Sequence, residues 1–128
     1  MIPRYRAWDK EFKEMVQVDA LVFDEQIIKV TYKNGNVVKE ELKNYVLMQS
    51  TGMTDKNGKE IFEGDILGTK DGLLNGVVEF NIDLGMWTNS LLRYNNFERL
   101  CSIANSREII GNIWENGELL DGENTEEN

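Results

Sequence analysis

The 128-residue chain contains no histidine and a single cysteine, Cys101. The lack of histidine removes the commonest general base, the commonest metal ligand, and every nucleophilic site built on a Ser–His or Cys–His pair. One cysteine cannot form an internal disulfide, which favours a reducing, cytoplasmic setting. Because Arg99 is its one basic neighbour in the sequence, we expect Cys101 to be a buried or half-buried structural thiol rather than a reactive one.

The sequence also lacks long apolar runs and phosphate-binding loops. No segment approaches the ~18 apolar residues that a membrane-spanning helix needs. The charged N-terminal residues are not followed by the apolar core of a signal peptide. Neither Gly-x-x-x-x-Gly-Lys-Ser/Thr nor Gly-x-Gly-x-x-Gly occurs. We therefore expect a cytoplasmic protein with no membrane contact and no bound cofactor or metal.

Acidic residues outnumber basic ones, and the excess is unevenly spread. The formal net charge is −9, from 14 Lys and Arg against 23 Asp and Glu. Residues 1–47 are balanced, whereas residues 48–120 carry six basic and eleven acidic side chains and residues 121–128 carry four acidic ones. An acidic chain repels phosphate backbones, so nucleic acid would bind only at a strong local basic patch.

Short β-rich stretches fill the first third of the chain. Their alternating and β-branched residues predict strands. The stretches are residues 2–8, 12–18, 21–23, 27–32, 37–42 and 45–49. For the second of them, a short helical face formed by Phe12, Met15 and Val16 is the alternative. Asn34-Gly35 between two strands predicts a two-residue hairpin turn with positive φ at both positions.

The segment LMQSTGMTDKNGKEIFEGDILG, residues 47–68, organises the middle of the chain. Its DKNG run, residues 55–58, has turn chemistry, because the Asp55 carboxylate can accept a backbone N–H two residues on, and Asn and Gly tolerate positive φ. A calcium loop starting at Asp55 would need an oxygen ligand at its fifth position and glycine at its sixth. The chain has Lys59 and Glu60 there, so we expect a turn and no EF-hand.

The second half of the chain also favours β structure. Strands are predicted at residues 76–82, 86–92 and 107–114, the last with Gly111 as a bulge or a close backbone approach. Val78 and Phe80 would share one face of their strand. The stretch 91–103 fits both a loose helix and a loop. Each Asn-Gly step is expected to end a strand; these steps stand at residues 34–35, 57–58, 75–76 and 116–117.

Three blocks of the sequence carry a resemblance to a known family. They are residues 2–9 (IPRYRAWD), residues 48–66, and residues 109–120 (IIGNIWENGELL). Together they span nearly the whole chain, which resembles the YopX-like family of small proteins from phages and prophages of Gram-positive bacteria. The family pattern usually has Pro where this chain has Gly117. The resemblance implies a mostly β fold with an SH3-like barrel in its C-terminal part, and it brings no established catalytic or ligand-binding residues.

A chain of this length accommodates one domain, or one domain with a small appendage. Residues 64–67 and the strand at residues 76–80 are similar to the opening hairpin of SH3-like barrels. We therefore expect a mainly β (β-rich α+β) fold. Residues 1–47 would form an N-terminal β meander, residues 48–120 an SH3-like β-barrel, and residues 121–128 a disordered acidic tail.

Two groups of side chains suggest alternative functions. Glu63 and Asp65 would share a face on a strand and could serve as the carboxylate pair of a hydrolase. A solvated turn edge is the commoner setting for such acids. Arg4, Arg6 and Lys10, interleaved with aromatic residues, could bind a single nucleic-acid strand, although neighbouring acidic residues cancel their charge.

Our leading hypothesis is a non-enzymatic protein-interaction or self-assembly module in the cytoplasm of the bacterial host. The partner would be a host or phage protein, or a second copy of the chain, bound through an exposed strand edge or loop. The candidate interaction residues lie mainly in the central segment, and they are Thr51, Asp55, Asn57, Glu63, Asp65 and Trp87. The alternative is a nucleic-acid-binding protein that uses Arg4, Arg6 and Lys10.

Overall fold

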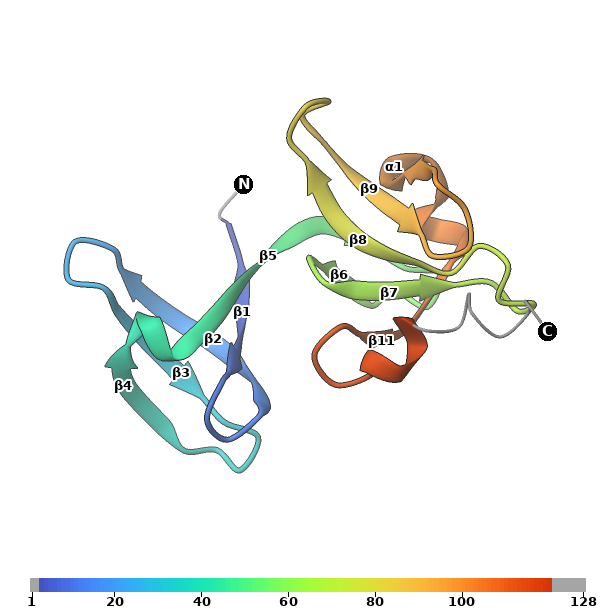
Figure 1. Ribbon diagram of the computed structural model, residues 1–128. Helices are drawn as coiled ribbons and strands as arrows, with labels where there is room; N and C mark the ends of the chain where they lie inside the picture. Colours follow the sequence, from blue (N-terminus) through green and yellow to red (C-terminus); the bar gives the residue numbers. More distant parts are fainter. Residues whose placement is uncertain (1–2, 121–128) are drawn as a thin grey trace. The chain divides into compact units, whose positions relative to one another are not determined.

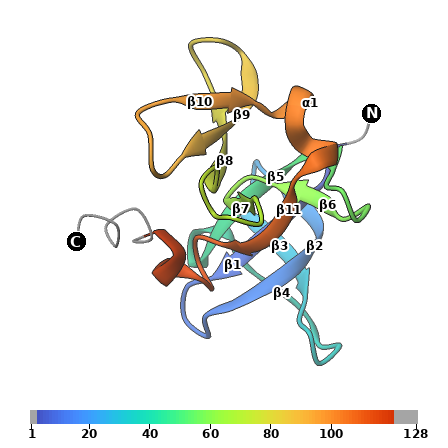
Figure 2. The same cartoon turned by 90° about the vertical axis from the view of Figure 1, so that its right-hand side faces the viewer.

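The computed structural model describes residues 3–120 and consists mostly of β-strands (Figure 1, Figure 2). The chain divides into two compact units, one up to Ser50 and one from Thr51 onward. In the part of the chain that is described, no helix combines the length and the apolar character that a membrane crossing requires. The prediction of a mainly β chain is confirmed. The predicted disordered tail, residues 121–128, lies outside the described residues.

The first unit is an antiparallel sheet built largely from consecutive hairpins. Its elements are β1 (Tyr5–Asp9), β2 (Glu14–Val22), β3 (Ile27–Thr31), β4 (Val37–Glu41), the short 3-10 turn η1 (Leu42–Asn44) and the first half of β5 (Tyr45–Thr54). The strand order is β4-β3-β2-β1-β5, so the chain returns after β4 to place β5 beside β1. β4 is left at the edge of this sheet.

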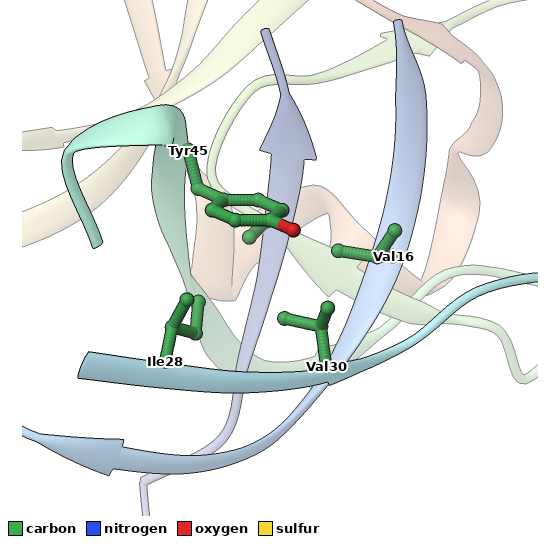
Figure 3. Close-up of a cluster of buried hydrophobic side chains, with 5 residues drawn as sticks. Val16, Ile28, Val30 and Tyr45 are labelled. Atoms are coloured by element: carbon green, nitrogen blue, oxygen red, sulfur yellow. The ribbon is translucent and has the colours of Figure 1, made fainter. Parts of the chain in front are cut away.

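Side chains from several strands form the core of the first unit. Ala7, Val16, Ile28, Val30 and Tyr45 are buried together. Figure 3 shows the ring of Tyr45 beside Val16, with Ile28 and Val30 pointing toward it from β3. Along β3, Ile28 and Val30 face inward and the residue between them faces outward. This two-residue alternation fixes the register of the strand.

The helical alternative for residues 12–18 is wrong. β2 begins at Glu14, and Phe12 lies in the preceding turn with 71% of its surface exposed. Val16 is buried in the core, and Met15 points to the opposite side of the strand, as strand alternation requires. The stretch is thus too short for the spacing of its apolar residues to distinguish a helical face from a half-buried strand.

The hairpin predicted at Asn34-Gly35 is present, but its turn is one residue longer than expected. The backbone N–H of Tyr32 donates to the carbonyl of Asn36 at 2.8 Å, which leaves three residues in the loop. Only Gly35 of the Asn-Gly pair has positive φ, at 92°. A three-residue loop with one left-handed glycine matches the twist of the two strands, so the second left-handed residue is not needed.

The second unit contains the rest of β5 and the remaining strands. These are β6 (Glu60–Phe62), β7 (Asp65–Gly68), β8 (Gly76–Asn81), β9 (Met86–Leu91), β10 (Phe97–Arg99) and β11 (Glu108–Asn112), with the helical turns α1 (Leu100–Ile103) and η2 (Ala104–Ser106) before β11. Five strands form an antiparallel sheet in the order β10-β9-β8-β7-β11, while β6 pairs with β5. The last strand, β11, therefore lies beside β7 after the helical turns α1 and η2.

The core of the second unit draws on strands and on the helical turns. Ile61, Leu67, Val78, Leu100 and Ala104 are buried together. One of these, Leu100, comes from residues 91–103, the stretch whose sequence fits both helix and loop. That stretch ends β9, forms a loop and β10, and then enters α1, so it holds more than one kind of structure.

Two glycines of the second unit have specific roles. The bulge predicted at Gly111 is confirmed, because the register between β7 and β11 shifts between Ile109 and Gly111. Gly76 begins β8, as the strand predicted at residues 76–82 requires, so the Asn75-Gly76 step does not end a strand. A Cβ at Gly76 would stand 2.7 Å from the backbone oxygen of Ser90 and 2.5 Å from Oδ1 of Asn89. Glycine is required there for close approach of β9, not for a turn.

Candidate functional site

Asp55 holds the central turn and joins it to the last strand. Its side chain is buried, with 3% of the residue exposed. One carboxylate oxygen accepts the backbone N–H groups of Asn57 (2.8 Å) and Lys59 (2.9 Å), and the other accepts that of Ile109 (3.0 Å). Burial raises the pKa of Asp55, but these hydrogen bonds, that from Ile109 first, outweigh burial and hold the pKa below its ordinary value. The predicted turn is confirmed, and the acceptor groups of the carboxylate are directed at the backbone.

Glu63 and Asp65 do not share a strand face. They stand on either side of Gly64, whose φ is 89°, at the turn between β6 and β7. Asp65 is buried and accepts the backbone N–H of Phe62 at 2.8 Å, whereas Glu63 is half-buried. A turn with positive φ breaks the two-residue alternation on which the strand interpretation depends. The shared strand face on which the alternative of a hydrolase carboxylate pair depends is therefore absent for Glu63 and Asp65. Among the described residues, no group of three or more Asp, Glu, Cys or His side chains could hold a metal ion.

The other members of the predicted interaction surface are at least partly exposed. Asn57 is exposed at the tip of its turn, and Glu63 and Trp87 are half-buried. Thr51 is half-buried and donates its hydroxyl group to the carbonyl of Ile61 at 2.8 Å. Asp55 and Asp65 are buried, and a binding role stays a prediction for all six residues.

The basic residues near the N-terminus differ in their surroundings. Arg4 is exposed and Arg6 is half-buried on β1. Lys10 follows β1 and donates its ammonium group to the carbonyl of Lys43 at 2.9 Å. The three side chains are therefore not equally available to a ligand, and nucleic-acid binding through them stays a prediction.

A row of hydrogen-bonding side chains in the first unit has no signal in the sequence. The Tyr32 hydroxyl donates to Asp9 Oδ2 (2.5 Å), and the Tyr45 hydroxyl donates to Glu40 Oε1 (2.5 Å). Burial, then the hydrogen bond to Asp9, raises the pKa of Tyr32 to about 12. Burial and the bond to Glu40 raise the pKa of Tyr45 as well. The four residues come from four different parts of the chain, so no local motif marks them.

One face of the β8–β9 hairpin is apolar beyond the core. Val78 is buried, and further along β8 Phe80 lies on the same face, as predicted. Phe80 contacts Trp87 edge to face, with ring centroids 5.3 Å apart and an interplanar angle of 77°. In the turn that follows, Ile82 is 83% exposed and Leu84 is also exposed. We call Phe80, Ile82, Leu84 and Trp87 the apolar hairpin; its strands are labelled β8 and β9 in Figure 1.

The opposite face of the same hairpin carries a hollow. Glu79 on β8 pairs with Thr88 on β9, and Ser90 on β9 pairs with Phe97 on β10. Residues paired in this way project to the same side of a sheet. The loop after β9 brings Tyr94 beside them, and the resulting hollow, which is open to solvent, has a volume of about 340 Å³. We call it the outer hollow.

A buried ion pair supports the strand at the side of this hollow. Arg107 forms two parallel bonds with Glu98 on β10, at 2.5 and 2.6 Å, and Asn89 donates to the same carboxylate at 3.1 Å. The Arg107 guanidinium lowers the pKa of Glu98 despite burial, and the carboxylate raises the pKa of Arg107. The pair ties β10 to the segment before β11.

Cys101 is exposed, contrary to the expectation of a buried thiol. It lies on the short turn α1, where Leu100 takes the buried position. Ile103 of the same turn also packs against the core, and Cys101 lies on the outward side between these two residues.

Comparisons with known proteins identify relatives of the whole chain. The family model described as YopX protein matches residues 4–121. The structure resembles the crystal structure of protein EF1440 from Enterococcus faecalis, with a TM-score of 0.64 and 33% sequence identity, over 94% of this chain and 99% of that chain. It also resembles protein yopX from Bacillus subtilis, with a TM-score of 0.55 and 20% identity, over 91% of this chain and 96% of that chain. No curated protein matches the sequence. Since the family model covers nearly the entire length, the chain belongs to the YopX protein family.

Proposed function

We propose that this protein is a non-enzymatic interaction module, encoded by a phage or prophage, that binds a basic host or phage protein in the bacterial cytoplasm. The observation that carries the proposal is the apolar hairpin. Exposed aromatic and branched aliphatic side chains that gather on one element are typical of protein-binding surfaces. Here Phe80, Ile82 and Leu84 are exposed on a single hairpin.

The charge of the second unit indicates the kind of partner. Residues 51–120 carry eleven acidic and six basic side chains. A basic partner would be attracted at long range and held at short range by apolar contact. The buried acids Asp55 and Asp65 are used to hold backbone turns, which leaves exposed acids such as Glu79 and Asp83 for the partner.

A pull-down from infected host lysate tests the proposal. Tagged protein is compared with the double variant Ile82→Ser/Leu84→Ser, with and without nuclease. Phe12→Ser is the matched control, since it removes an equally exposed apolar side chain from the first unit. We expect a nuclease-resistant protein band that is lost with the double variant and retained with Phe12→Ser.

Other results would contradict the proposal or favour a different function. A band retained by the double variant would contradict the role of the apolar hairpin. Recovery that disappears with nuclease would favour nucleic-acid binding through Arg4, Arg6 and Lys10. Self-association without any other captured protein, seen as a doubled mass in light scattering, would favour a self-assembly module. A variant truncated after Leu120 tests whether the acidic residues that follow contribute.

A further inference from the structure

The outer hollow is built from three adjacent strands and one loop of the second unit. Figure 2 shows β8, β9 and β10 together in this part of the molecule. Its wall is fixed by backbone contacts, because the N–H of Leu91 donates to the carbonyl of Asn96 (3.0 Å) and the N–H of Phe97 donates to the side chain of Asn96 (2.8 Å). At about 340 Å³ it is at the small end of ligand sites, a size suited to one side chain rather than to a large cofactor.

Glu79 gives the hollow its charge. It is the single ionisable carboxylate among the lining residues, and none of them is basic. Within residues 3–120, no side chain forms an ion pair or hydrogen bond with the Glu79 carboxylate; the contact from Thr88 goes to the backbone carbonyl. Arg99 shares this face of the sheet but does not line the hollow. An unneutralised carboxylate in a concave site focuses a negative potential there and favours a cation.

Two aromatic rings complete the site. Tyr94 is 49% exposed and Phe97 is 39% exposed, and both residues line the hollow together with Glu79. The face of an aromatic ring attracts an ammonium or guanidinium group. Ser90 and the asparagine side chains of the lining supply oxygen acceptors for the remaining N–H groups of such a ligand.

We propose that the outer hollow binds a lysine or arginine side chain of the partner protein, held by the Glu79 carboxylate and the rings of Tyr94 and Phe97. This inference rests on the proposed interaction function and names the chemistry of its partner. The apolar hairpin and the outer hollow are on opposite faces of the same two strands. One partner segment that wraps around this hairpin would place apolar residues on one face and a basic residue on the other.

The test is a titration of the isotope-labelled full chain followed by amide NMR shifts. The probes are N-acetyl-arginine amide, N-acetyl-lysine amide, N-acetyl-citrulline amide, which keeps the shape of arginine without its charge, and methyl glucoside as a neutral polar ligand. We expect the two cationic probes to shift the amides of Glu79, Ser90, Tyr94 and Phe97, and the two neutral probes to leave them in place. Raising the salt concentration should weaken the effect.

Paired variants identify the carboxylate responsible. Glu79→Gln should weaken arginine-amide binding about fivefold, the scale of an exposed charge pair. Asp83→Asn removes the same charge from the turn of the same hairpin, outside the hollow, and should leave binding unchanged. If Glu79→Gln does not fold, Tyr94→Ser in the loop replaces it and should weaken binding through loss of one ring.

Several outcomes would overturn the inference. Equal shifts from citrulline or methyl glucoside would mean that the hollow recognises a neutral polar ligand. Shifts that map elsewhere, or unchanged affinity in Glu79→Gln, would exclude the assigned contact. Failure here is distinguishable from failure of the interaction function: a captured partner with no arginine-amide binding rejects the hollow alone, whereas arginine-amide binding with no captured partner rejects the module alone.

Discussion

The hydroxyl oxygens of Tyr32 and Tyr45 lie 2.7 Å apart in the first unit. Each is also 2.5 Å from a carboxylate oxygen, of Asp9 and Glu40 respectively. Two hydroxyl hydrogens are thus shared among three short oxygen–oxygen contacts. A substitution at either tyrosine therefore changes the hydrogen bonding of the whole row. Asp9 further accepts the backbone N–H groups of the following turn, which connects the row to the β1–β2 hairpin.

The tyrosine row predicts a loss of stability at alkaline pH. The pKa of Tyr32 is raised to about 12 and that of Tyr45 is raised too, mainly by burial. A raised pKa in the folded state contributes stability that is complete below the unfolded value of about 10 and is lost as pH rises through the folded value. We expect tyrosinate absorbance to keep rising beyond about pH 11, together with falling thermal stability. Complete titration of all tyrosines by about pH 11 would contradict this.

Removal of one hydroxyl should weaken the first unit. Tyr45→Phe keeps the buried ring but deprives Tyr32 and Glu40 of a partner, at a cost of about 1–2 kcal/mol. Urea unfolding measures the difference. Tyr5→Phe is the matched control, since the Tyr5 hydroxyl has no hydrogen-bond partner among residues 3–120. Equal losses in both variants would show that the row contributes nothing specific.

Asp55→Ala should lower the stability of the fold more than the removal of an exposed acidic side chain does. It leaves three backbone N–H groups without their acceptor, that of Ile109 included, at a cost of about 2–4 kcal/mol. Because the pKa of Asp55 is lowered in the fold, its contribution is present above about pH 4 and is lost as pH falls through the folded value. Chemical unfolding at neutral and acidic pH tests both points. In Asp24→Ala, an exposed turn position, we expect little change.

Gly76→Ala should destabilise the second unit by about 1–3 kcal/mol, because the new Cβ meets the backbone of β9, which cannot move without breaking the sheet. Gly117→Ala makes the same chemical change where nothing lies within 4 Å, and we expect it to be neutral. Thermal unfolding of the two variants makes the comparison. A neutral Gly76→Ala would show that the sheet can open at this position.

Local patterns predicted much of the fold. The alternation around Ile28 and Val30, the DKNG turn and the bulge at Gly111 are short-range features, and each is found in the structure. The inward orientation of Asp55 depends on the N–H of Ile109, 54 residues away, and no local pattern contains that contact. For the same reason, the sequence could not show that the Asp55 side chain is buried rather than exposed to solvent.

The outer hollow could not be predicted from the sequence, for a related reason. Its residues come from β8, β9, β10 and a loop whose conformation the spacing left open. Register between neighbouring strands, not the composition of any one strand, places Glu79 near Phe97. Cys101 illustrates a second limit: residue type favours burial on average, but in the short turn α1 the neighbouring Leu100 takes the buried position.

The edge position of β4 has a consequence for how the protein behaves in a crowded cell. Lys39 on this strand lies directly opposite Lys29, and like charges in that position weaken a sheet. Glu40 and Glu41 follow, so the unpaired side of the strand is densely charged. An edge of this kind is a poor template for a second chain, since added strands would bring further like charges together. The charges on β4 thus lower the stability of the first unit slightly, and they make aggregation through this strand less favourable.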